Sequence, residues 1–136
     1  MDQNERERLV HDYIAAHTLV WDDSMVLRKK EPSNHAEGAL YDMVWTQPTT
    51  AWDIMCDISR ATAVSDILQS VANGPLHQML REHPHMMDRI EQDAEVSAQV
   101  RLLLSHLWDD VSDSPIGPLM PRIRKASGEF DEPLDA

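Results

Sequence analysis

The chain has 136 residues, of which 42% are hydrophobic, and this is enough to close one core without disulfides. Its 24 acidic and 12 basic residues give a formal net charge of −12, which argues against nucleic-acid binding because that affinity comes largely from Lys and Arg. No apolar run approaches the roughly 20 residues that span a bilayer, and the N-terminus lacks a signal-peptide core, so we expect a soluble, cytoplasmic protein without membrane contacts. The acidity suits either a basic partner or ordinary solubility.

The first half of the chain is dominated by helical periodicity. Apolar residues recur at intervals of three and four over residues 4–21, which predicts an amphipathic helix. Pro32 interrupts this pattern, and a short helix is expected over 34–46. Proline and threonines then open a third helix within 47–61, whose apolar face includes Cys56. We expect the thiol of this single cysteine to be buried and unreactive.

The second half contains shorter helices separated by prolines. The dipeptide Gly74-Pro75 predicts that one helix ends and the next begins, and Pro84 ends that next helix. The last eight residues, "EFDEPLDA", hold four acids and no base, and they predict an acidic, mobile tail at 129–136. The helices are expected over residues 62–73, 75–83, 84–96, 97–110 and 118–126.

These elements predict an all-α fold of about seven short antiparallel helices in a single domain over residues 1–128. Residues 49–108 suggest two consecutive helix pairs, each burying an apolar face against the next as in a HEAT-like stack. The letters show no clear repeat, so an irregular bundle remains the alternative. Trp21 and Trp108 fall on the apolar stripes of their helices, and we expect both in the core.

One set of letters in the middle and C-terminal part of the chain forms a recognisable series. It consists of Gly74, Pro75, Leu76, Leu80, His83, Asp88, Arg89, Ile90, Glu91 and Trp108. On these residues the chain resembles a family of small all-helical bacterial domains of unknown function. The resemblance implies an all-helical bacterial domain and assigns no catalytic residue.

The strongest metal-like pattern is the D-D-x-x-D of Asp109, Asp110 and Asp113. Residues three and four apart share a face of a helix, so two of these carboxylates could chelate magnesium. The adjacent "SDSP" is typical of a helix that frays into a turn, which favours solvated aspartates at a helix end. A second Trp-Asp-Asp occurs at 21–23, and the two acidic pairs suit the Arg and Lys of a partner.

The histidines give weaker signals. His83, His85 and Asp88 are close in sequence, but Pro84 places a helix boundary between them. His11 and the aspartate after it match only two letters of the helical phosphohydrolases, which need further metal ligands on other helices. We therefore predict no catalytic residue, metal or cofactor.

Small size, acidity and the lack of an active site favour a non-enzymatic binding module. Our hypothesis is an immunity-type inhibitor that neutralises a cognate bacterial toxin by covering its basic active-site cleft. The alternatives are a divalent-metal-dependent hydrolase that uses the three aspartates of the D-D-x-x-D and a self-associating helical scaffold. The expected partner-binding residues are Asp22, Asp23, Glu91, Asp93, Glu95, Asp109, Asp110 and Asp113.

Overall fold

The computed structural model describes residues 1–21, 27–29, 35–107 and 115–128. Eight α-helices account for most of this part of the chain, and the predicted all-α class is confirmed. The helices are α1 (Gln3–Ala16), α2 (His35–Thr46), α3 (Pro48–Ala61), α4 (Ser65–Val71), α5 (His77–Glu82), α6 (Met87–Val96), α7 (Ala98–Ser105) and α8 (Met120–Ser127). A π-helical turn spans Ala72–Leu76, 3-10 turns span Pro84–Met86 and Gly117–Leu119, and a hairpin pairs β1 (Leu19–Trp21) with β2 (Leu27–Lys29).

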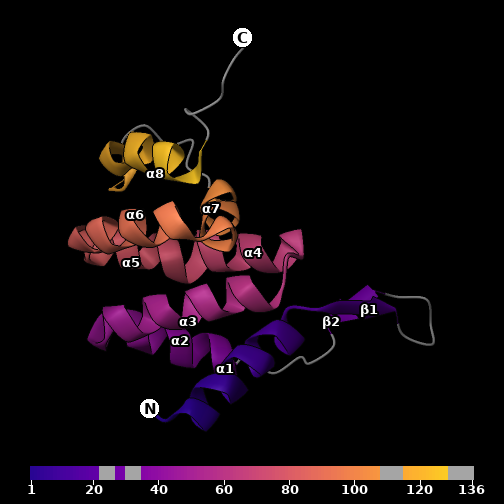
Figure 1. Ribbon diagram of the computed structural model, residues 1–136. Coiled ribbons are helices and arrows are strands. Elements are labelled where there is room, and N and C mark those ends of the chain that lie inside the picture. The colour runs from indigo at the N-terminus through magenta and orange to yellow at the C-terminus, as the bar shows by residue number, and fades with distance from the viewer. Residues whose placement is uncertain (22–26, 30–34, 108–114, 129–136) are drawn as a thin grey trace.

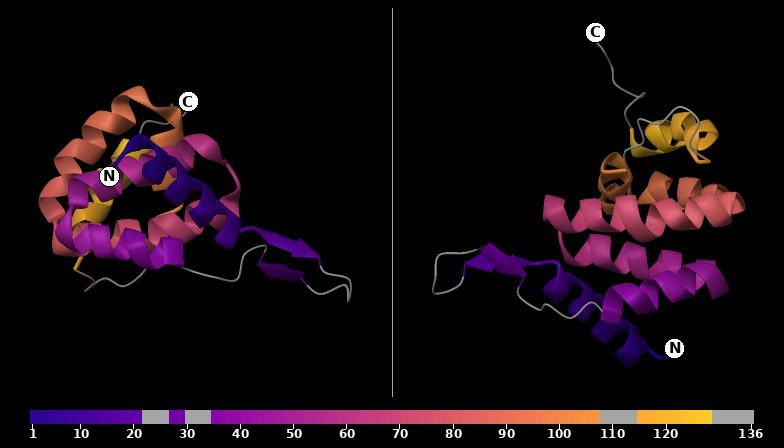
Figure 2. Two further views of the ribbon diagram at one scale, coloured as in Figure 1. Left: turned by 90° about the horizontal axis from the view of Figure 1, so that it is seen from below. Right: turned by 180° about the vertical axis from the view of Figure 1, so that it is seen from behind.

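The helices succeed one another in layers from the N-terminal to the C-terminal end (Figure 1). Helix α1 packs on α2 and α3, α3 packs on α7, and α6 and α7 pack on α8, the last layer. The hairpin projects sideways from this stack, as all three ribbon views show (Figure 2). This order favours the predicted HEAT-like stack over the irregular bundle.

One hydrophobic core runs through all the layers. Its fully or almost fully buried side chains include Tyr13 of α1, Leu40 of α2, Trp52 of α3, Leu103 of α7 and Ile123 of α8. Each helix therefore buries one apolar stripe and exposes a polar one, as its sequence periodicity requires. None of the described helices is long and apolar enough to cross a membrane.

The first helix ends five residues earlier than predicted. Asp2 caps its start by accepting a hydrogen bond from the Glu5 amide at 2.8 Å, and the helix stops at Ala16. The Thr18 hydroxyl donates to the Ile14 carbonyl at 2.6 Å, which satisfies one of the acceptors that the helix end leaves free. The chain then enters β1, where Leu19 pairs antiparallel with Lys29 of β2. The prediction of helix up to residue 21 was wrong because the run Leu-Val-Trp also suits a strand.

The predicted helix break at Gly74-Pro75 is also wrong. Helices α4 and α5 form one continuous helical run, and the π-helical turn joins them. Pro75 has no N–H to donate to the preceding turn, and a wider π turn accommodates the missing bond. Gly74 leaves room for Tyr41, because a Cβ at this position would lie 2.6 Å from the Tyr41 hydroxyl oxygen and would require that side chain to shift.

Most other boundaries agree with the sequence to within a few residues. Helices α2, α3 and α6 occupy the predicted ranges, and Pro84 follows the end of α5 as expected. Helix α7 ends at Ser105, before the predicted limit at residue 110. Trp108 and the acidic tail at 129–136 lie outside the described residues.

Candidate functional site

Only three of the eight predicted partner-binding residues lie in the described part of the chain. Asp22, Asp23, Asp109, Asp110 and Asp113 lie outside it. The other three belong to α6 but do not form a single acidic strip. Residues 91 and 95 are four apart and share a face, whereas residue 93 lies on the opposite side of the helix.

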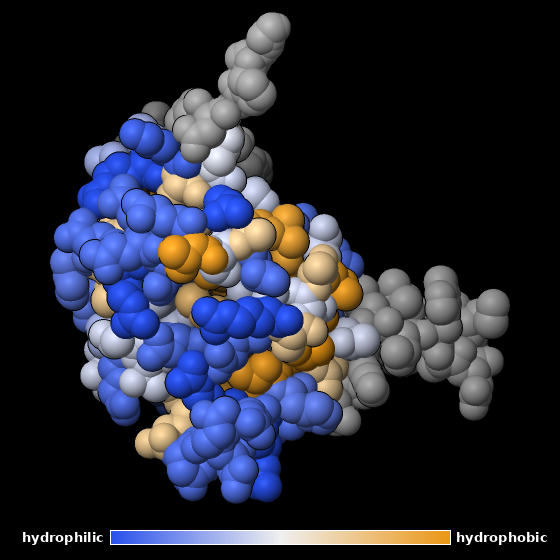
Figure 3. Space-filling model, in the orientation of Figure 1, coloured by the Kyte–Doolittle hydropathy of each residue, from blue (hydrophilic) through white to orange (hydrophobic). Residues whose placement is uncertain are grey.

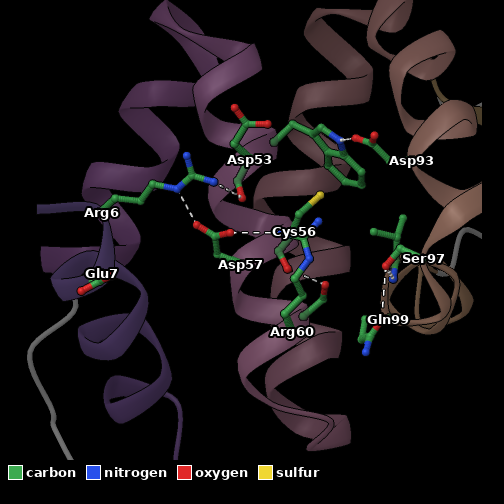
Figure 4. Close-up of polar contacts among 12 residues, drawn as sticks. Arg6, Glu7, Asp53, Cys56, Asp57, Arg60, Asp93, Ser97 and Gln99 are labelled. Carbon is green, nitrogen blue, oxygen red and sulfur yellow. Dashed lines mark hydrogen bonds and ion pairs between the residues drawn. The ribbon is translucent and has the colours of Figure 1, made fainter. Parts of the chain in front are cut away.

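Asp93 joins α6 to the buried face of α3. Its carboxylate accepts a hydrogen bond of 2.7 Å from the indole nitrogen of Trp52, whose side chain is fully buried (Figure 4). Arg89 lies 3.4 Å from the same carboxylate and donates to Asp53 of α3 at 2.6 Å. Asp93 therefore accepts a hydrogen bond from a buried donor and pairs with an arginine. Its negative charge stabilises the contact between α3 and α6.

A second set of charges joins α3 to α1. The Arg6 guanidinium donates to Asp57 at 2.5 Å, and Arg60 donates to the other oxygen of Asp57 at 3.2 Å (Figure 4). A shallow groove of about 330 Å³ beside them includes Gln3 and Glu7 in its lining. Because two arginines balance Asp57, this groove offers little uncompensated charge.

Cys56 lies on α3 among these contacts, and the predicted burial of its side chain is confirmed. Burial, with a smaller effect of Asp93, raises the pKa of the thiol to about 12. The thiol is therefore protonated at neutral pH and is a poor nucleophile.

A buried polar cluster connects α1 with α2 and α4. The Ser70 hydroxyl donates to the Ile67 carbonyl at 2.7 Å, so it accepts the hydrogen bond from the Tyr13 hydroxyl, 2.8 Å away. Burial raises the pKa of the Tyr13 phenol. His17 stacks on the Tyr13 ring, with its Nδ1 2.9 Å from the Tyr13 carbonyl and its Nε2 2.7 Å from Glu37. A carbonyl only accepts, so Nδ1 donates to the Tyr13 carbonyl.

The hairpin lies in the chain between α1 and α2. The contact between His17 at the end of α1 and Glu37 in the first turn of α2 joins the two ends of this connection. Neither residue stands out in the amino-acid sequence, since nothing in the periodicity pairs side chains across two helices. The cluster holds α1, α2 and α4 together, and its polar atoms form hydrogen bonds with other groups of the protein.

The described residues contain no group of three or more His, Cys, Asp or Glu side chains that could hold a metal ion. The rings of His83 and His85 lie edge to face with centroids 5.9 Å apart, and Asp88 is engaged by Arg122 at 2.8 Å. Asp12 contacts the side chains of His11 and His35 on the exposed surface of α1 and α2.

The larger groove lies between α6, α7 and α8 and has a volume of about 680 Å³. Glu91 on one wall accepts two hydrogen bonds from Arg122, at 2.6 and 3.0 Å, which hold the pKa of this carboxyl below its usual value. Arg101 donates one bond to the Ala94 carbonyl at 2.7 Å. The rest of the lining is Ala94, Glu95, Lys125, Ala126 and Gly128.

The groove is lined by side chains of both charges and by three small residues, Ala94, Ala126 and Gly128. Within the described part of the chain, neither Glu95 nor Lys125 forms an ion pair. Two predicted acids, Glu91 and Glu95, therefore lie on it, together with bases that sequence analysis did not single out. The groove is the main candidate site for a ligand.

The charges of the whole molecule divide unevenly. The described residues carry 14 of the 24 acids and 11 of the 12 bases, a net charge of −3. Residues 22–26, 30–34, 108–114 and 129–136 carry the other 10 acids and 1 base, a net charge of −9. Most of the excess negative charge therefore belongs to four short segments.

The sequence of residues 23–128 matches a family of unknown function, DUF6869. The chain belongs to this family. The match confirms the resemblance to a family of unknown function, and it covers α2 to α8. No curated protein and no solved structure matches the chain. Helix α1 precedes the matched region, but Tyr13 of α1 and its C-cap residue His17 contact Ser70 and Glu37 within that region.

Proposed function

We propose that this DUF6869 protein is a non-enzymatic binding module for a basic protein, most specifically an immunity-type inhibitor that covers the basic active-site cleft of a cognate bacterial toxin in the cytoplasm. The observation that carries the proposal is the division of charge. The described residues have a net charge of only −3, whereas the remaining four segments have −9. Negative charge concentrated in this way attracts a basic surface and orients it during approach.

The ion pairs narrow the set of residues available to a partner. Asp93 and Glu91 are bound by Trp52, Arg89 and Arg122, so displacing them would break contacts between helices. The proposed partner-binding residues are therefore Glu95 with Asp22, Asp23, Asp109, Asp110 and Asp113.

Exposed apolar side chains can supply the short-range part of such an interface. Val64, which precedes α4, is 55% exposed, and Leu102 of α7 is 41% exposed; α4 and α7 pack together. A hydrogen bond of 3.3 Å between Ser65 and His106 links the same two helices beside them. Complementary charge would raise the association rate by roughly 10- to 1000-fold, while buried apolar anchors would determine the residence time of the complex.

The first experiment expresses the chain together with its native genomic neighbours and purifies it at 50 mM and at 1 M NaCl. We expect a stoichiometric basic partner at low salt and its loss at high salt, since screening weakens contacts between exposed charges. The triple variant Asp109→Asn/Asp110→Asn/Asp113→Asn should weaken this complex at least tenfold. Three other acids, changed as Glu7→Gln/Asp42→Asn/Asp66→Asn, provide the control with the same change of net charge. Equal weakening by both triples, or binding that ignores salt, would contradict the proposal.

The two alternatives make different predictions. A divalent-metal-dependent hydrolase that uses Asp109, Asp110 and Asp113 requires magnesium, manganese or zinc to raise the melting temperature, because a ligand of the folded state stabilises it. A self-associating scaffold would use the exposed Val64 and Leu102 instead. Light scattering at high protein concentration tests the scaffold, which requires a dimer or larger species that Leu102→Lys dissociates.

A further inference from the structure

The chain leaves the described helices at the wall of the large groove. Gly128 ends α8 in the left-handed conformation, with φ of 93°, and it is also one of the residues that line the groove. Glycine adopts this conformation without strain. The segment that follows, residues 129–136, is therefore covalently attached at the rim.

The groove and this segment are complementary in chemistry. Glu91 of the groove is bound by Arg122, so one acid without an ion pair, Glu95, lies there beside two bases. These bases are Lys125, which has no ion pair among the described residues, and Arg101, which donates one N–H to the Ala94 carbonyl and keeps others. Ala94 and Ala126 give the groove an apolar part. The segment "EFDEPLDA" supplies four carboxylates, no base, and the apolar side chains of Phe130 and Leu134.

We propose that residues 129–136 bind in the groove between α6, α7 and α8, where their carboxylates pair with Lys125 and Arg101. Fully extended, eight residues reach at most about 28 Å, so the segment can cover a groove that begins at its own attachment point. Attachment also converts binding into an intramolecular step with an effective concentration in the millimolar range. Contacts that would be too weak to hold two separate molecules together are therefore sufficient to hold the attached segment in the groove.

Docking would give the acidic segment a role in regulation. A segment held on Lys125 and Arg101 has its charge compensated, and a basic partner would compete with these two side chains for it. This consequence rests on the proposed function, whereas the docking itself does not. The partner would then bind with an affinity reduced by the fraction of molecules in which the segment is docked.

The test uses the full chain with a nitroxide label on Ala136→Cys. Cys56 is buried and protonated, so the label goes to the new cysteine in the folded protein. Paramagnetic broadening of the backbone amides is measured at 50 mM and 500 mM NaCl without any partner. We expect strong broadening at Glu95 and Arg101, which are far from residue 136 in sequence, and at least a twofold recovery of their signals at the higher salt.

Two charge reversals on α8 provide the decisive comparison. Lys125→Glu changes a side chain that lines the groove, whereas Arg124→Glu makes the same charge change on the same helix outside that lining. Lys125→Glu should restore the signals of Glu95 and Arg101 at least twofold, and Arg124→Glu should leave them broadened. Broadening that is absent at these two amides, or that both variants relieve equally, would overturn the docking. That outcome would leave the proposed partner untouched, since no partner takes part in this measurement.

Discussion

Gly74 shows what a single residue contributes to this fold. Its missing side chain gives room to the Tyr41 hydroxyl, which would lie 2.6 Å from a Cβ at this position. We expect Gly74→Ala to lower the free energy of unfolding by about 1–2 kcal/mol, because the cost of overpacking exceeds the gain in helix propensity. Urea denaturation measures this change.

The same clash can be removed from the other side. Tyr41→Phe deletes the hydroxyl, so the double variant Gly74→Ala/Tyr41→Phe should recover at least half of the loss. Gly38→Ala is the matched control in the exposed face of α2, where a Cβ meets nothing within 4 Å, and it should stabilise by about 0.5–1 kcal/mol. If Gly74→Ala stabilised as much as Gly38→Ala, the packing role of Gly74 would be wrong.

At the scale of elements, the sequence predicted what depends on local pattern. The apolar spacing gave α2 and α3, and Pro84 marked the end of α5, because periodicity and the missing proline N–H act within one segment. Gly74-Pro75 was misread as a break because the same letters also permit a π turn, which accommodates the missing N–H of Pro75 without ending the helix.

The candidate site depended on contacts that local pattern does not contain. The acids of α6 were visible in the sequence, but their partners come from α3 and α8, many residues away along the chain. Asp93 and Glu91 therefore looked like free surface charges, and Lys125 and Arg101 of the groove went unnoticed.

The ion pair between α6 and α8 gives the fold a dependence on pH. Arg122 lowers the pKa of Glu91 from its usual 4.5, so the folded state binds this proton less readily than the unfolded state. The stabilisation by Glu91 is thus complete above pH 4.5 and is lost as the pH falls through the lowered value. We expect Glu91→Gln to reduce the urea midpoint slightly at pH 7, and the difference from the unmodified chain to shrink as the pH falls below 4.5. Glu95→Gln, the same change without an ion pair, should show no such convergence.

At the scale of the whole molecule, the helices in the middle of the stack have more packing neighbours than the helix in the last layer. Helix α3 contacts α1, α2 and α7 and buries seven of its residues, whereas α8 is the last layer and buries two. The face in Figure 3 is hydrophilic over most of its left side, with hydrophobic residues gathered nearer the hairpin side. In a stack of this kind, each layer is stabilised mainly by its neighbours.

This arrangement predicts how the molecule opens. Amides of α8 should exchange with solvent through local opening at a lower free energy than global unfolding, and those around Ile54 and Ile58 in α3 should exchange last. Glu91→Gln removes one carboxylate from the clamp on Arg122, so it should speed exchange in α8 several-fold and leave α3 close to its original rate. Hydrogen exchange of the full chain at pH 7 distinguishes the layers.

If α8 and α3 exchanged at one common free energy and responded equally to Glu91→Gln, the protein would unfold as a single cooperative unit. The separate stability that we assign to the last layer would then be wrong.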